Sequence, residues 1–212
     1  MMIRRLLIAA LLSVPLAACQ TAQQPVATAD DDNWYVGSIP DQPHNIPLVD
    51  RRKMDPKYAR QTVEYKGPEK PGSIVVDIDE RMLYLVQPEG KAIRYGVGVG
   101  KQGFSWRGVA SVGRKGVWPA WSPTKTMVGI KPDLPRHMEA GLDNPLGARA
   151  LYLHQNGADT LFRIHGTNEP WSIGEQVSSG CVRMLNEDVA DLYERVPVGT
   201  TVYVKRNGRY RV

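Results

Sequence analysis

Residues 165–184 read HGTNEPWSIGEQVSSGCVRM, a stretch in which a cysteine follows a histidine by sixteen positions. A cysteine attacks a carbonyl group only as the thiolate, so a nucleophilic cysteine needs a base or a cation within reach. Pro170 and Gly174 lie at turn positions, so the chain can fold back and bring His165 close to Cys181. A buried structural thiol and a hydrogen-bonded core imidazole are the alternative for such a pair.

Small residues crowd the cysteine on its N-terminal side. Ser178, Ser179 and Gly180 would let the backbone pass close to a bound carbonyl group, whose developing oxyanion needs fixed N–H donors. We therefore expect the backbone N–H groups near Gly180 and Cys181 to form an oxyanion hole. The two serines either bond the intermediate or are simply small.

The segments His-Gly-Thr, Ile-Gly and Ser-Ser-Gly-Cys-Val-Arg-Met-x-Asn resemble the active-site signature of the YkuD-type L,D-transpeptidases. The resemblance extends upstream through Asn144–Gly147 and Ala150–Leu153 and covers about residues 72–205. Many family members carry a histidine at the position of Ser179, whereas the Ser-Ser-Gly-Cys form resembles a branch of Gram-negative periplasmic enzymes. This departure leaves His165 as the evident base of the loop.

The resemblance implies a peptidoglycan L,D-transpeptidase that works without cofactor or metal. In that activity Cys181 attacks the L,D peptide bond of a tetrapeptide stem, and His165 accepts the thiol proton and later returns one. An acceptor amine on another stem's diaminopimelate releases the acyl group and forms a 3-3 cross-link. Gly166, Thr167 and Arg183 are expected to bind substrate, although a salt bridge bracing the loop is the alternative for Arg183. The family also implies that carbapenems acylate Cys181.

Three alternatives stay open at this point. A catalytic zinc ion needs three protein ligands, and Cys181, His165 and His154 could supply them. A wall-binding lipoprotein without catalytic activity would carry the same sequence features. Finally, the same thioester chemistry could attach an outer-membrane protein or lipoprotein to peptidoglycan, or could use water as the acceptor.

Residues 1–18 resemble a lipoprotein signal peptide. Two arginines precede a short apolar run, and the Leu-Ala-Ala-Cys sequence ending at Cys19 matches a lipobox, in which the cysteine is lipidated. The apolar run is too short to remain as a membrane-spanning helix. We expect a periplasmic, lipid-anchored protein, at the outer rather than the inner membrane because Gln20 follows Cys19. A plain secretory signal is the alternative.

The chain has two cysteines and a formal net charge of +5. If lipid occupies Cys19, then Cys181 has no partner within the chain, and an unpaired thiol in an oxidising compartment is prone to oxidation. This argues for a reactive role of Cys181. The mild positive charge would help attract an anionic wall polymer. Nucleic acid is not expected as a partner, because no basic run with interleaved aromatic residues occurs.

The chain is expected to divide at residue 70. Residues 19–70 are rich in proline and polar residues, which favours a linker or an N-terminal arm packed on the domain. Residues 71–206 are expected to form the catalytic domain, and residues 207–212 a C-terminal tail. Residues 98–103 match the dinucleotide-binding spacing G-x-G-x-x-G, but no helical periodicity follows, so hairpin glycines are expected instead.

Short strands dominate the catalytic region. Alternating apolar residues and turn signals predict strands at 73–78, 81–86, 93–99, 150–154, 161–165 and 200–205, with an Asn156-Gly157 hairpin turn. A short helix is expected within 131–141. A second helix is expected after Asn186, which would cap it, with one apolar face formed by Val189, Leu192, Tyr193 and Val196. These elements predict a mainly β protein with a mixed sheet and one or two short helices. The resemblance adds that the fold is a YkuD-like β-sandwich.

Overall fold

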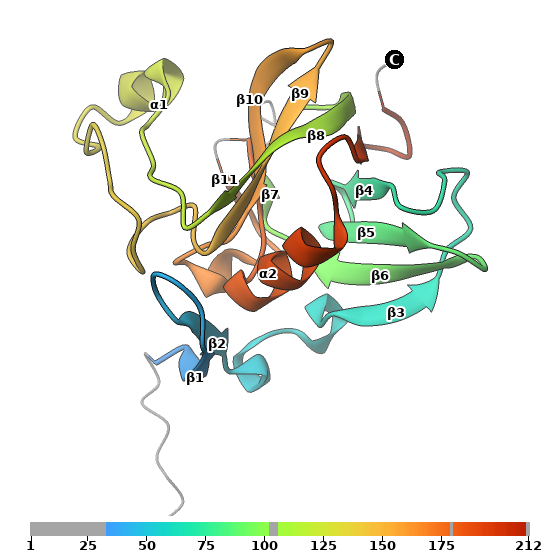
Figure 1. Cartoon of the computed structure of the whole chain (residues 1–212), viewed down its shortest axis with the longest axis horizontal. Coiled ribbons are helices and arrows are strands. Elements are labelled where there is room, and N and C mark those ends of the chain that lie inside the picture. Colours follow the sequence, from blue (N-terminus) through green and yellow to red (C-terminus); the bar gives the residue numbers. More distant parts are fainter. Residues whose placement is uncertain (1–32, 102–105, 179, 211–212) are drawn as a thin grey trace, which may run out of the picture. The chain divides into compact units, whose positions relative to one another are not determined.

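The computed structural model describes residues 33–101, 106–178 and 180–210 of the chain. From Trp34 onward, the chain forms one compact unit. The predictions for the signal peptide and lipidated Cys19, and those for Ser179, fall outside the described residues. The unit is mainly β with a mixed sheet and few helices, which confirms the predicted fold class (Figure 1).

In the described part of the chain, nine strands form the main sheet. They are β3 (Gln61–Glu64), β4 (Ile74–Asp77), β5 (Met82–Gln87), β6 (Lys91–Gly96), β8 (Gly108–Val117), β9 (Arg149–Gln155), β10 (Ala158–His165), β12 (Val182–Arg183) and β13 (Thr201–Lys205). Their order across the sheet is β12-β10-β9-β8-β13-β4-β5-β6-β3. The sheet is mixed because β12 runs parallel to β10 and β13 runs parallel to β4, whereas the other neighbours are antiparallel.

Smaller elements surround this sheet. Two further strand pairs are antiparallel β1 (Tyr35–Ile39) with β2 (Ile46–Val49), and parallel β7 (Val99–Gly100) with β11 (Gln176–Ser178). The helices are α1 (Lys125–Ile130), α2 (Asn186–Arg195) and the 3-10 turns η1 (Arg51–Lys53), η2 (Pro56–Tyr58) and η3 (Pro170–Ser172). None of the helices that the structure describes has the length and apolar character needed to cross a membrane.

The β9–β10 hairpin forms as predicted, with Asn156 and Gly157 at the turn. Their φ angles of 51° and 79° lie in the left-handed region that a two-residue hairpin turn of type I′ requires. Asparagine and glycine adopt this region at low cost. The turn fixes the start of the hairpin, and a register shift between Asp159 and Arg163 then places His165, the last residue of β10, opposite Ala150.

Two helix predictions were wrong in detail. The short helix lies at 125–130 rather than within 131–141, since the Thr124 side chain accepts a hydrogen bond from the Met127 N–H and caps its start. Pro132 and Pro135 then interrupt a helix in the following segment. Asn186 does not cap α2 but is its first residue, and its side chain bonds elsewhere.

Gly98 and Gly100 do not precede a helix. Gly98 forms an isolated bridge with Arg183, and Gly100 ends β7. A Cβ on Gly98 would lie 2.5 Å from the Ser172 carbonyl oxygen, so the close approach of two backbones requires glycine here. The next described element along the chain is strand β8, and β7 pairs in parallel with β11, so Gly98 and Gly100 have structural roles but do not lie in the expected hairpin.

Helix α2 lies against the sheet and completes the core (Figure 1). The predicted apolar face is confirmed, because Val189, Leu192 and Val196 are buried in the main core and Tyr193 packs against it. This core joins residues of β4, β5 and β13 with residues of β8, β9, β10 and β12. The strand that ends at His165 and the segment that follows Cys181 are thus anchored in the same apolar interior.

The segment before residue 71 contributes to this unit from Trp34 onward. Strand β3 pairs with β6 and forms one edge of the main sheet. Arg51 of η1 forms ion pairs with Glu187 and Asp188 of α2. The arm thus contacts the helix that follows the cysteine loop.

Candidate active site

Strand pairing brings Cys181 and His165 onto one face of the sheet. His165 of β10 is in register with Arg183 of β12, and Ile164 is in register with Val182. Cys181 immediately precedes β12, so its side chain points away from the core, to the same face as His165. With about 4.8 Å between strands and about 3.3 Å per residue, the two α-carbons lie about 8 Å apart.

Both residues line a cavity of about 300 Å³. Its floor is formed by side chains of β8, β9 and β10, and residues of the segment leading into α1 line it as well. The described lining residues are Arg114, Ala120, Trp121, Ser122, Thr124, Met127, Pro145, Leu146, Tyr152, Leu161, Arg163, His165, Ser178, Cys181 and Arg183. The segment 120–124, which leads into α1, thus borders this cavity.

A backbone carbonyl orients the imidazole of His165. The ring Nδ1 lies 2.6 Å from the Gly166 carbonyl oxygen, which can only accept a hydrogen bond. Nδ1 therefore carries a proton, and in the neutral ring the lone pair is on Nε2. His165 is buried, and this burial, together with the Arg183 guanidinium, lowers the pKa of its imidazole to about 4. The ring is neutral at pH 7 and able to accept a proton.

Cys181 is partly exposed, and its sulfur lies 4.0 Å from the Leu161 carbonyl oxygen. Desolvation raises the pKa of the thiol above its ordinary value. The Arg163 backbone and the Arg163 and Arg183 guanidinium groups act in the opposite direction, because they stabilise the thiolate. The free protein therefore holds a neutral thiol beside a neutral imidazole rather than a thiolate–imidazolium pair.

Ser178 fixes the turn before the cysteine. Its hydroxyl donates to the Cys181 carbonyl oxygen at 2.6 Å and accepts from the Gly180 N–H at 3.2 Å. Gly180 has a φ of +132°, which favours glycine. Because Ser178 occupies the Gly180 N–H, that group is not a free oxyanion donor. Among the described contacts the Cys181 N–H has no acceptor, so it is the donor that the turn leaves for an oxyanion.

Two arginines beside the cysteine are neutralised by carboxylates. Arg183 forms an ion pair with Glu169, which is the alternative that the sequence left open for it, although it also lines the cavity. Arg163 forms a two-pronged ion pair with Asp159, with distances of 2.7 and 2.9 Å. Both guanidinium groups thus contribute positive potential near the sulfur while their own charge is compensated.

Gly166 and Thr167 are not among the residues that line the cavity. The Gly166 N–H donates to the Arg149 carbonyl, and the Thr167 hydroxyl accepts from the Glu169 N–H. The Asn186 side chain donates to the Thr167 carbonyl at 2.9 Å and accepts from the Ala148 N–H at 2.9 Å. These two residues, for which the sequence suggested substrate binding, instead brace the backbone that follows His165.

A second cavity of about 570 Å³ adjoins the first, and the two share Met127 and Arg183. Lys101, Lys131, Trp171 and Val177 are among the other residues that line it. The side chain of Trp171 is exposed. Arg183 therefore lines both cavities beside the cysteine loop.

Three polar residues of the first cavity were not predicted as site residues from the sequence, namely Arg114, Tyr152 and Arg163. They lie side by side because Arg163 and Arg114 are both in register with Tyr152. The alternation of side chains along β10 would place Arg163 on the face of His165. The positions of Arg114 and Tyr152 beside it could not be predicted, because the β9–β10 and β8–β9 pairs both contain register shifts that the sequence pattern does not show.

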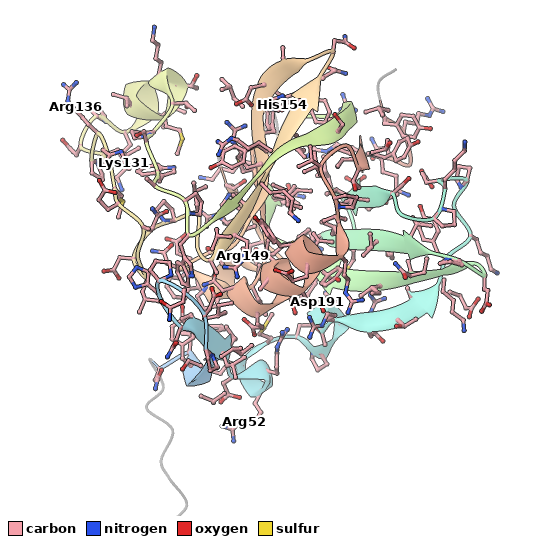
Figure 2. The ribbon with its side chains drawn as sticks, viewed as in Figure 1. Arg52, Lys131, Arg136, Arg149, His154 and Asp191 are labelled. Atoms are coloured by element: carbon pink, nitrogen blue, oxygen red, sulfur yellow. The ribbon has the colours of Figure 1, made fainter. Side chains whose placement is uncertain are left out.

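His154 is not among the residues that line the cavity of Cys181 and His165. Its ring packs over Gly113, where an added Cβ would approach within 2.3 Å, and it lies in register with Asp159. Figure 2 shows His154 on the β9–β10 hairpin. Within the described residues, no three histidine, cysteine or acidic side chains come together as a metal site would require.

Comparisons with known proteins give one consistent family. The family model YkuD, the L,D-transpeptidase catalytic domain, matches residues 71–204. "Probable L,D-transpeptidase ErfK/SrfK" of Escherichia coli K12 is 36% identical over 140 residues, which are 62% of this chain and 43% of that protein. "Probable L,D-transpeptidase YbiS" of the same organism is 37% identical over 139 residues, with the same coverage. The match thus spans less than half the length of these relatives.

Among solved structures, one titled as a probable carnitine operon oxidoreductase from Brucella melitensis is 49% identical. It covers 71% of this chain and 95% of that chain, with a TM-score of 0.49. An L,D-transpeptidase from Mycobacterium smegmatis is 19% identical and covers 75% of this chain and 87% of that chain, with a TM-score of 0.48.

Proposed function

Because this chain belongs to the YkuD family of L,D-transpeptidase catalytic domains, we propose that it is a peptidoglycan L,D-transpeptidase with Cys181 as nucleophile and His165 as general base. One observation supports this assignment above all others: Cys181 and His165 share one face and one cavity, although they are sixteen positions apart in the sequence. A neutral imidazole with its lone pair on Nε2 is the form that a general base requires.

The first half-reaction is acylation of the enzyme. His165 Nε2 takes the thiol proton as the Cys181 sulfur attacks the carbonyl carbon between the L-centre of diaminopimelate and D-Ala. The Cys181 N–H donates to the oxyanion of the tetrahedral intermediate. The C–N bond then breaks, the imidazolium gives its proton to the departing D-Ala amine, and a thioester remains.

The second half-reaction consumes the thioester. An acceptor amine attacks the thioester carbonyl carbon, and His165 takes a proton from this amine. The C–S bond then breaks, and the imidazolium returns the proton to the departing sulfur, which regenerates the thiol. A 3-3 cross-link results when the amine belongs to a second stem. Two adjoining cavities, which meet at Met127 and Arg183, suit a reaction that brings two peptides to one sulfur.

The expected location completes the proposal. The lipobox at Cys19 suggests a lipid anchor, and Gln20 after the cysteine favours the outer membrane of a Gram-negative cell. From there the domain would reach the peptidoglycan layer. The same chemistry would attach a membrane protein to peptidoglycan if a protein amine replaced the stem amine.

The decisive experiment is incubation of the protein with tetrapeptide-rich sacculi, followed by mass spectrometry of the muropeptides. We expect 3-3 linked dimers from the wild type and none from Cys181→Ala, which keeps wall binding. Intact mass should show a carbapenem adduct on the wild type and not on Cys181→Ala. A wild type that binds sacculi but yields neither new muropeptides nor an adduct would show a non-catalytic wall-binding protein. Released D-Ala without cross-links would identify water as the acceptor.

A further inference from the structure

Strand β8 contains a bulge that changes the direction of one side chain beside the cavity. Val112 is in register with Leu153 and Arg114 with Tyr152, so Gly113 is an extra residue on the β8 side. Regular alternation would place Arg114 on the same face as Val112, which is buried in the core. The extra residue turns Arg114 to the opposite face instead, the face of Cys181 and His165.

Arg114 lies on this face in a defined position. Its guanidinium carbon is 3.4 Å from the centre of the Tyr152 ring, and Arg163 stacks on the same ring at 4.5 Å. Arg114 also lines the cavity that contains Cys181. The stacked arrangement restricts the guanidinium group, so little side-chain entropy is lost when this group binds a ligand.

The charge of Arg114 is not compensated by the part of the chain that the structure describes. No carboxylate there forms an ion pair or hydrogen bond with it, and the residue is exposed. The other two arginines of the cavity are each paired, Arg163 with Asp159 and Arg183 with Glu169. The cavity therefore offers one guanidinium group with its donors free for a ligand.

We propose that Arg114 is a specificity-determining residue that binds a carboxylate of the donor stem peptide, and this inference rests on the proposed function. A planar guanidinium group pairs with a carboxylate through two parallel N–H···O bonds, which fixes both position and orientation. A stem peptide carries several carboxylates, so one of them must lie in this cavity when its acyl carbon reaches Cys181.

The spacing favours the carboxylate on the side chain of diaminopimelate. Arg114 and Cys181 are separated by three strand spacings, which place their α-carbons about 14 Å apart. Because the guanidinium group of Arg114 lies over Tyr152, one strand nearer, it is about 10 Å from the Cys181 α-carbon. The C-terminal carboxylate of D-Ala lies about 4 Å from the attacked carbonyl carbon, whereas six bonds, about 7 Å, separate that carbon from the distal carboxylate of diaminopimelate.

The first test measures donor specificity with Arg114→Gln and, as a matched charge control, Arg136→Gln. Arg136 is exposed on the loop after α1 and is not among the residues that line either cavity beside Cys181 (Figure 2). We expect kcat/KM for the free-acid tetrapeptide to fall about tenfold to a hundredfold in Arg114→Gln, mainly through KM, and to stay unchanged in Arg136→Gln.

Amidated donors then identify the carboxylate. A donor whose distal diaminopimelate carboxylate is amidated should react equally slowly with the wild type and Arg114→Gln, whereas a donor amidated at the D-Ala terminus should still distinguish them. The reverse pattern would assign Arg114 to the terminal carboxylate. If Arg114→Gln reduces turnover of the free-acid donor and of both amidated donors by the same factor, the assignment of Arg114 to either of these carboxylates is wrong.

A second test does not depend on transpeptidation. Iodoacetate and iodoacetamide alkylate the same thiol, but only iodoacetate carries a carboxylate. Alkylation is quantified by mass spectrometry on the peptide that contains Cys181. We expect the ratio of the iodoacetate rate to the iodoacetamide rate to fall about three- to fivefold in Arg114→Gln, because the variant loses the attraction of one positive charge about 10 Å from the thiol. The ratio should remain at the wild-type value in Arg136→Gln. An unchanged ratio in Arg114→Gln would overturn the carboxylate site, whereas a lowered ratio without any transpeptidation would overturn the proposed function alone.

Discussion

At the scale of single residues, burial sets the protonation states of Cys181 and His165. Desolvation raises the pKa of the Cys181 thiol and lowers that of the His165 imidazole, so both groups are neutral in the free protein. A neutral pair protects the thiol from oxidation, because the thiolate is the reactive form. In the proposed mechanism, substrate binding then has to bring the carbonyl group into reach before the proton moves to Nε2.

The lowered pKa of His165 predicts a pH-dependent stability. The imidazole takes up a proton near pH 6.5 in the unfolded chain but only near pH 4 in the folded one. Between these values the unfolded state binds more protons, so the free energy of unfolding decreases as pH falls from 6.5 to 4, by about 3 kcal/mol for this group. Urea unfolding at several pH values should show this loss in the wild type.

His165→Asn is the matched variant, because its amide can still donate to the Gly166 carbonyl but does not titrate. We expect the difference in unfolding free energy between wild type and variant to change by about 3 kcal/mol between pH 6.5 and 4. Acidic groups such as Glu187 titrate in both proteins and cancel in this difference. A difference that stays constant with pH would show that burial does not lower the pKa of His165.

At the scale of elements, the start of α2 holds two loops at the site. Asn186 bridges the Ala148 N–H and the Thr167 carbonyl, and both bonds are buried. Added Cβ atoms on Gly147 and Gly166 would approach its side-chain oxygen within 2.1 and 2.2 Å, so both glycines are needed for this close contact. At the C-terminal end of α2, the ammonium group of Lys115 in β8 donates hydrogen bonds to the Tyr193 and Val196 carbonyl oxygens.

Asn186→Ala should destabilise the protein and slow acylation. The substitution leaves one buried N–H and one buried carbonyl without partners, which costs about 3 kcal/mol in unfolding free energy. Because Thr167 lies two residues after His165, we also expect a lower kcat with little change in KM. Asn168→Ala, which removes a bond to the Asp143 carbonyl at an exposed position, should cost less than about 1 kcal/mol. Equal effects of the two variants on kcat would rule out a positioning role for Asn186.

At the scale of the whole described unit, ion pairs connect the arm to the catalytic region across 137 positions of sequence. Arg51 contacts Asp188 at 3.0 Å, and Asp188 is fully buried. Burial raises the pKa of Asp188, whereas Arg51 and Arg60 act to lower it. Glu187 has the same arrangement, since it is buried and pairs with Arg51 at 3.1 Å.

Arg51→Met should therefore destabilise the protein much more than Arg52→Met. Loss of Arg51 leaves the buried carboxylates of Glu187 and Asp188 without their main cation, which should lower the free energy of unfolding by about 2 kcal/mol. The loss is no larger because Arg60 remains near Asp188 and Arg51 is itself partly exposed. Arg52 is largely exposed and pairs with Asp50, so its loss should hardly change the free energy of unfolding (Figure 2).

The pH dependence provides a second readout for the same pair. In Arg51→Met the pKa of Asp188 rises further, so the charged form destabilises the folded state more as pH increases through the acidic range. The stability deficit relative to wild type should be larger at pH 8 than at pH 4. Chemical unfolding at the two pH values measures it, and a larger deficit at pH 4 would contradict the role assigned to Arg51.

The sequence by itself determined the local features of this protein. Apolar alternation and the Asn156-Gly157 turn predicted the β9–β10 hairpin, and apolar spacing predicted the buried face of α2. These predictions depend on residues close in sequence, for which backbone geometry and turn chemistry suffice. The motif around Cys181 and His165 likewise carried the family and the candidate catalytic pair.

Only the tertiary structure decided which side chains lie around Cys181 and His165 and which contacts hold their loops. Arg183 pairs with Glu169, Asn186 bridges two loops instead of capping its helix, and the Gly113 bulge directs Arg114 toward the cavity. The pairing of distant strands sets these contacts, and one extra residue reverses the face of every side chain beyond it. Burial, which sets the pKa values of Cys181 and His165, likewise depends on the packed unit and not on any local pattern.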